Sequence, residues 1–143
     1  EIRVDNSAVE SVTLEDVIRI DADVFGGARR PIIESLVERS RAFSCEDKNY
    51  NGYLLGRDGR NASQIGPIFT ANPTSAIEML NHALSHLKGR VFIDACDHQI
   101  NFIERLKEYS FKPQRPFLRM AKNDGSNFGA PVQMFAMAGP ELG

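Results

Sequence analysis

The middle of the chain carries the feature that most constrains its fold: a strand, a loop, a helix and a second strand in direct succession. Residues 60–69 and residues 90–95 are apolar stretches typical of strands. Between them lie a polar loop at residues 70–75, which contains Pro73, and an apolar helical repeat at residues 77–87. Two strands joined through a helix are expected to run parallel, and the start of the helix then lies at an edge of the sheet where ligands bind.

The neighbouring elements predict a mostly antiparallel sheet around this single crossover. Asp58-Gly59 is a tight-turn signal that sets residues 60–69 antiparallel to the strand before them. Thr13 with Asp16 forms a capping-box pattern at the start of a helix. The other expected elements are helices at residues 14–25, 31–37 and 99–109, and strands at residues 2–4, 42–45, 52–57, 112–120 and 132–138. The predicted fold class is therefore α/β (α+β), a mixed sheet of about six to seven strands with four helices in one domain, residues 1–143.

Composition excludes several classes of protein. The 143 residues are 42% hydrophobic and 25% charged, as in soluble globular domains. A net charge of −2 gives no general attraction to nucleic acid or to an anionic membrane, and no apolar run approaches the ~20 residues of a membrane span. Two cysteines make no disulfide framework, so a cytoplasmic location is expected. The first residue, Glu1, suggests a piece cut from a longer protein.

The loop before the middle helix is a candidate anion site. Asn72 suits the N-cap and Pro73 the first helical position, which is expected to leave the next backbone N–H groups free. Free N–H groups and the helix dipole favour a phosphate, and no carboxylate comes before Glu78 to compete with it. The alternative is that Asn72 and Pro73 only start the helix.

Reactive side chains cluster at the end of the second parallel strand. Asp94 lies at the carboxyl edge, where it is a candidate to hold an acceptor amine or remove its proton; the alternative is a cap or a partner of an arginine. Cys96 and His98 are candidates for a metal site or a nucleophile pair. The simpler interpretation is that Cys96 is buried and Asp97 caps the next helix.

Two further groups carry weaker signals. His82 and His86 share one helix face at a spacing that can bind zinc, but a third ligand is missing and a solvated face is the default, so no metal is predicted. Four arginines flank strands and are candidate contacts for a phosphate or an anionic substrate: Arg57, Arg60, Arg115 and Arg119.

The order and spacing of six stretches resemble the GNAT N-acetyltransferase superfamily. The resemblance is closest to GNAT-like domains that follow another GNAT domain in tandem proteins. The stretches are VFGGARR, GYLLGRDGR, IGPIFTANPTSAIEML, VFIDA, FKPQRPFLRM and FAMAGPELG, which together span residues 24–143.

The resemblance implies acetyl-coenzyme A as the cofactor, direct attack by a primary amine, and pantetheine between the strands at residues 60–69 and 91–95. A backbone N–H near Ile68 or Phe69 would polarise the thioester, and Asp94 is the catalytic candidate. Tyr53, Arg57 and Arg119 are the substrate-binding candidates. The cofactor-binding candidates are Ile68, Phe69, Thr70, Ala71, Asn72, Thr74, Ser75 and Ala76.

Three positions depart from the family pattern. Asn72 and Thr74 stand where glycines usually let the backbone approach phosphate, and Leu106 stands where many members have a proton-donating tyrosine. These departures support a second hypothesis, a non-catalytic module that binds acyl-coenzyme A or a metabolite or packs on a neighbouring catalytic domain. The expected partners are a small-molecule or peptide amine, and a neighbouring GNAT domain or a second copy; neither nucleic acid nor a membrane is expected.

Overall fold

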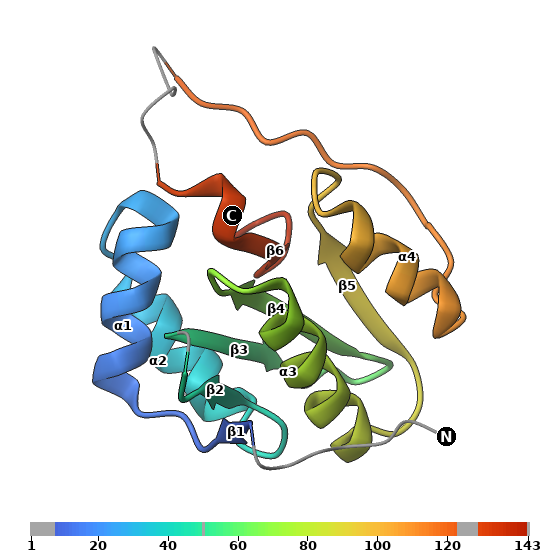
Figure 1. The fold of residues 1–143 in the computed structure, drawn as a ribbon, viewed down its shortest axis with the longest axis horizontal. Coiled ribbons are helices and arrows are strands. Elements are labelled where there is room, and N and C mark those ends of the chain that lie inside the picture. The colour runs from blue at the N-terminus through green and yellow to red at the C-terminus, as the bar shows by residue number, and fades with distance from the viewer. Residues whose placement is uncertain (1–7, 50, 123–128, 143) are drawn as a thin grey trace.

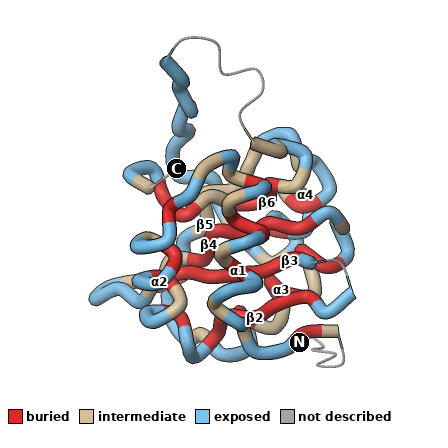
Figure 2. Tube along the Cα trace, turned by 90° about the vertical axis from the view of Figure 1, so that its left-hand side faces the viewer, coloured by how far each residue is buried: buried red, intermediate tan, exposed pale blue. Residues whose placement is uncertain are grey.

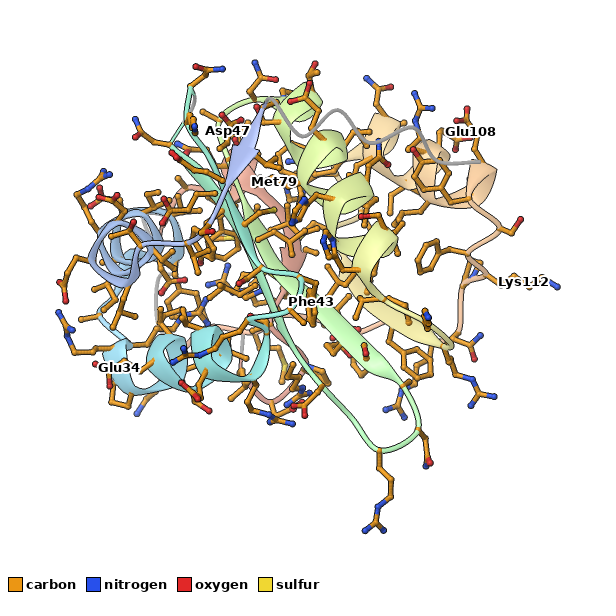
Figure 3. All side chains as sticks on the ribbon, turned by 90° about the horizontal axis from the view of Figure 1, so that it is seen from below. Glu34, Phe43, Asp47, Met79, Glu108 and Lys112 are labelled. Carbon is orange, nitrogen blue, oxygen red and sulfur yellow. The ribbon has the colours of Figure 1, made fainter. Side chains whose placement is uncertain are left out.

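A six-stranded sheet lies between two pairs of helices in the computed structural model, which describes residues 8–49, 51–122 and 129–142 (Figures 1 and 3). The helices α1 and α2 cover one face, and α3 and α4 cover the other. The strands are β1 (Val9–Glu10), β2 (Cys45–Asp47), β3 (Gly52–Arg57), β4 (Ser63–Phe69), β5 (Val91–Ala95) and β6 (Met134–Met137). The helices are α1 (Leu14–Asp21), α2 (Arg30–Arg39), α3 (Pro73–His86) and α4 (Ile100–Glu108).

The strand order confirms the predicted mixed, mostly antiparallel sheet with one crossover. Strands β1 to β4 pair antiparallel in sequence order, and β5 pairs with β4 in parallel after the α3 crossover. The last strand, β6, runs antiparallel to both β4 and β5. Figure 1 shows β4 and β5 diverging, with β6 beside both.

Each face of the sheet has its own apolar core. Strand alternation sends Tyr53 and Leu55 toward α1 and α2, and Leu54 toward α3. Figure 2 shows β3, β4 and β6 largely buried, and Figure 3 shows Met79 of α3 pointing at the sheet. Burial of each large aliphatic side chain contributes about 1.5–3 kcal/mol.

A buried ion pair joins α1 to the residues before α2. Arg29 donates from Nε and Nη2 to the two carboxylate oxygens of Asp21, at 2.8 Å each. Tyr53 donates from its hydroxyl to the same carboxylate at 2.5 Å, and Arg29 also donates to the carbonyl oxygen of Leu142 at 2.8 Å. Between them, α1 continues as a π-helical turn, η1 (Ala22–Gly26). This network ties three separate segments to the sheet.

Three local expectations need correction. The strand expected at residues 42–45 lies at β2, because Phe43 packs into the core from a turn and the polar Glu46 and Asp47 form the ladder. Residues 112–120 form no strand; all are exposed, and two prolines there lack the N–H that a ladder requires (Figure 2). Thr13 is the N-cap of α1 without a side-chain cap. The strand expected at residues 2–4 lies outside the described residues.

Candidate functional site

The parallel strands stay together for only three residue pairs. Ser63 to Ile65 pair with Val91 to Ile93, and beyond that point β6 enters between the strand ends. The N–H of Thr70 donates to the carbonyl of Gln133, and the N–H of Cys96 donates to the carbonyl of Phe135, both at 2.9 Å. The gap in which pantetheine was expected therefore holds a strand of this chain.

The cofactor candidates on β4 are correspondingly enclosed. Ile68 is opposite Ala136 and Phe69 is opposite Met134 in the β4–β6 ladder, and both β4 side chains are fully buried. Thr70 is fully buried as well. These three residues support the sheet and the two cores rather than an open surface.

The start of α3 is closed by its own cap. The side-chain oxygen of Asn72 accepts from the N–H groups of Thr74 at 2.8 Å and Ser75 at 3.3 Å, and the N–H of Ala76 donates to the Asn72 carbonyl at 3.2 Å. The expectation that these N–H groups are free is therefore wrong, because asparagine is a strong N-cap. Ser75 and Ala76 are buried, whereas Ala71 and Thr74 are exposed.

The start of α4 is open by comparison. Its N-cap, Gln99, makes no side-chain cap; the Gln99 amide donates instead to the carbonyls of Val132 at 2.9 Å and Met134 at 3.1 Å. The first turn of α4 contains no acidic residue. Asp97, expected as the cap, lies three residues before the helix begins at Ile100. This helix start can accept an anion without displacing a side chain.

Both helix starts border one cavity of about 600 Å³, which we call the α3–α4 groove. It is lined by Pro73, Thr74, Ile77, Glu78, His98, Gln99, Ile100, Asn101, Phe102, Arg105 and Phe135. Of the predicted cofactor residues, only Thr74 lines it. Sequence reasoning missed the α4 side, where the available signal was a helix that begins without a Ser, Thr, Asp or Asn cap.

Asp94 lies on the opposite face of the sheet from the groove. Val91, Ile93 and Ala95 pack toward α3 and α4, so alternation directs Asp94 to the α1–α2 side. Burial raises the pKa of Asp94, and Glu141 adds to this against the opposing charges of Arg57 and Arg115. Its Oδ2 is buried without a hydrogen-bond partner in the described part of the chain. A carboxylate with a raised pKa is suited to act as a general base.

The three substrate-binding candidates have different surroundings. Tyr53 is fully buried and bonded to Asp21, so it stabilises α1 and offers no surface to a substrate. Arg57 forms an ion pair with Glu141 and is one quarter exposed. Arg119 donates to the sulfur of Met134 at 3.4 Å and stacks near the ring of Phe25. The two arginines therefore lie on the same side as Asp94.

The alternative reactive groups do not assemble into a site. Burial raises the pKa of Cys96 to about 11, which leaves a protonated and weakly nucleophilic thiol. His98 contacts the Pro131 carbonyl at 2.7 Å. His82 and His86 lie with their rings 4.5 Å apart, and among the described residues no group of three His, Cys, Asp or Glu side chains could hold a metal ion.

Leu106, which the resemblance places where many members have a tyrosine, is a buried side chain. Leu106 is 6% exposed and packs in the α3–α4 core. The nearby Tyr109 turns away and donates to Asn81 of α3 at 2.7 Å. Neither side chain lines the α3–α4 groove. No helix in the described ranges is long and apolar enough to cross a bilayer.

A mixed sheet with one crossover, covered by helices on both faces, defines an α/β domain with a groove beside two helix starts. A family model described as an acetyltransferase (GNAT) domain matches residues 17–135, and the chain belongs to this family. Searches of curated proteins and of solved structures gave no significant match. Membership of the family fits the observed fold and supports an acyltransferase class.

Proposed function

We propose that this chain is an N-acyltransferase that moves the acetyl group of acetyl-coenzyme A to a primary amine, with the donor bound in the α3–α4 groove. The observation that carries the proposal is this groove of about 600 Å³, bordered by an α4 start that no side chain caps. A drug-sized ligand occupies a cavity of this size. The family of the chain supports the choice of an acyl donor.

The groove residues fit the chemistry of such a donor. The open N–H groups of α4 and the guanidinium of Arg105 suit a pyrophosphate, because arginine binds phosphate in a bidentate manner. The apolar side chains of Ile77, Phe102 and Phe135 suit an uncharged arm. The donor phosphates would then lie against α4 rather than α3, where the cap of Asn72 occupies the N–H groups.

Transfer requires the acetyl end of the donor to pass the end of β6 and reach the α1–α2 side, where Asp94 and the acceptor would lie. Acetyl-coenzyme A, when bound, would supply an activated thioester. The amine nitrogen would attack its carbonyl as the C–S bond breaks, and solvent would protonate the thiolate. Asp94, directly or through a water, takes the amine proton, and Arg57 and Arg119 are placed to orient an acceptor that carries an anionic group.

A second candidate function is a non-catalytic module that binds acyl-coenzyme A. The specific observation in its favour is β6, which pairs with both β4 and β5 and separates the groove from Asp94. The glycine-poor loop before α3 and the apolar Leu106 also favour a module without catalytic activity. In this case the groove binds the donor, but no thioester is consumed.

Isothermal titration with acetyl-coenzyme A, followed by thioester turnover with a panel of amines, separates the two functions. We expect binding that Arg105→Ala weakens about tenfold, as loss of one charged phosphate contact should. Lys107→Ala is the matched control, since Lys107 pairs with Glu104 on the same helix outside the groove. Binding without turnover would favour the module, and no heat at high micromolar ligand would refute both.

A further inference from the structure

A second cavity lies at the far end of the sheet from the α3–α4 groove. It measures about 380 Å³ and is bordered by Ser63, the first residue of β4. The α3–α4 groove instead borders the start of α3, which follows the last residue of β4. Its walls come from the end of α2, the β3–β4 hairpin and β5. We call it the arginine cavity, after three of its lining residues: Arg39, Arg57 and Arg60.

The floor of the arginine cavity is a row of side chains on three adjacent strands. Arg57 of β3 is opposite Gln64 of β4, and Gln64 is opposite Phe92 of β5. Residues in register share one face of a sheet, so a cation, an amide and an aromatic ring stand side by side. Phe92 is 41% exposed, so part of its ring is open to a molecule in the cavity.

The side-chain amide of Gln64 lacks a hydrogen-bond acceptor. Its Nε2 is buried and has no hydrogen-bond partner in the described chain. Leaving such a donor unpaired is unfavourable, and most buried donors find a partner. An acceptor bound in the cavity would complete this bond once the Gln64 side chain turns its amide toward the cavity.

The charge of the lining has the opposite sign to that of the chain. Three arginines and a single carboxylate, Asp58, line the cavity, while the whole protein carries −2. Asp58 is held by Arg39, whose Nε donates at 3.0 Å. Arg60 is exposed and forms no ion pair within the described ranges. Arg57 pairs with Glu141, so Arg60 is the cation of the lining that is open to a bound anion.

We propose that the arginine cavity binds a small oxyanion attached to a flat apolar group, as a site separate from the acyl-donor groove. The oxyanion would contact Arg60 and Arg39 and accept from the amide of Gln64, and the apolar group would cover Phe92. The guanidinium group of arginine can form two parallel hydrogen bonds to either a carboxylate or a phosphate. The proposal does not depend on acyl transfer.

Phenyl phosphate and inorganic phosphate are the probes, titrated into this chain and followed by amide NMR shifts. We expect shifts at β3, β4 and β5 around the cavity, with phenyl phosphate about three to ten times tighter because its ring contacts Phe92. Phe92→Ala should abolish this preference and leave inorganic phosphate unchanged. An unchanged preference would overturn the proposal.

Three controls make the result specific. Arg60→Ala should weaken both probes several-fold, whereas Arg41→Ala removes the same charge near the end of α2 outside the cavity and should not. Gln64→Leu should weaken binding without lowering the unfolding midpoint, because it also removes a buried unpaired donor. Saturating acetyl-coenzyme A should leave the shifts intact. Equal losses in Arg60→Ala and Arg41→Ala, or displacement by acetyl-coenzyme A, would contradict the site.

Discussion

The two helical layers of this domain are attached to the sheet by different kinds of contact. The α1–α2 layer has, in addition to its apolar core, a buried charge network in which the carboxylate of Asp21 accepts from Arg29 and Tyr53. The α3–α4 layer is held by apolar contacts, such as the perpendicular rings of Phe102 and Phe135 at 5.6 Å. Directional bonds define one arrangement, whereas apolar contacts tolerate small shifts.

The difference explains where the open cavity lies. Between α3 and α4 the polar link from Tyr109 to Asn81 is at the end of α4 that is remote from its open start. The groove end is left to apolar side chains and to the start of α4, which has no side-chain cap. The buried ion pair thus belongs to the α1–α2 layer, and the larger of the two cavities described above lies beside the α3–α4 layer.

The largest effect is expected when Asp21 is removed from the charge network of the α1–α2 layer. Asp21→Ala leaves the Arg29 guanidinium buried without its carboxylate, so we expect the free energy of unfolding to fall by about 3–5 kcal/mol in urea titrations. Asp23→Ala is the control: Asp23 lies two residues further on, is exposed, and should change stability by at most about 0.5 kcal/mol. Equal effects of the two variants would show that the network does not anchor α1.

The matching test on the other layer is Leu106→Ala. Leu106 is 6% exposed, so its truncation should lower the free energy of unfolding by about 2–4 kcal/mol through lost contacts and a residual cavity. Lys107→Ala on the same helix should be nearly neutral. A change no larger than that of Lys107→Ala would show that the Leu106 side chain does not hold the α3–α4 layer.

A smaller effect is expected at the cap of α3. Asn72→Ala should lower the free energy of unfolding by about 1 kcal/mol, because the N–H groups of Thr74 and Ser75 lose their acceptor. Acetyl-coenzyme A affinity, measured by calorimetry, should stay the same or rise, since those N–H groups become available. A weaker affinity would place the donor at α3 instead of α4.

The smallest effect is a pH dependence from Asp94. Because the pKa of Asp94 is raised by burial in the folded chain, its stabilising contribution is present below the ordinary aspartate pKa and is lost as the pH rises through the raised value. Asp94→Asn should therefore gain stability relative to the parent as the pH rises through that window. Parallel curves of unfolding free energy against pH would contradict the raised pKa.

Elements with local signals were predicted well from the sequence. The bounds of β3 match the prediction because turn residues flank an apolar run, and α3 begins at Pro73 as expected. The π-helical turn before Gly27 continues the predicted first helix. In each case the deciding information lies within a few residues of the element.

The elements that were predicted incorrectly depend on contacts with residues that are distant in the sequence. Glu46 is a buried strand residue because its carboxylate accepts from the N–H of Thr13 at 2.6 Å, a pairing that no local pattern reveals. The same holds for β6, whose position between β4 and β5 depends on strands from another part of the chain. The N–H groups of Thr74 and Ser75 were expected to be free, but they donate to the side chain of Asn72, whose preference for capping was underestimated.

The position of β6 in the sheet also has a consequence for the order of folding. Ile68 and Ala136 are partners in the sheet although nearly half the chain separates them. Closing so long a loop is slow relative to forming the β3–β4 hairpin. In a refolding experiment with hydrogen exchange, the amides of Thr70 and Cys96 should consequently gain protection after those of the hairpin, so that the hairpin matures before the sheet is closed.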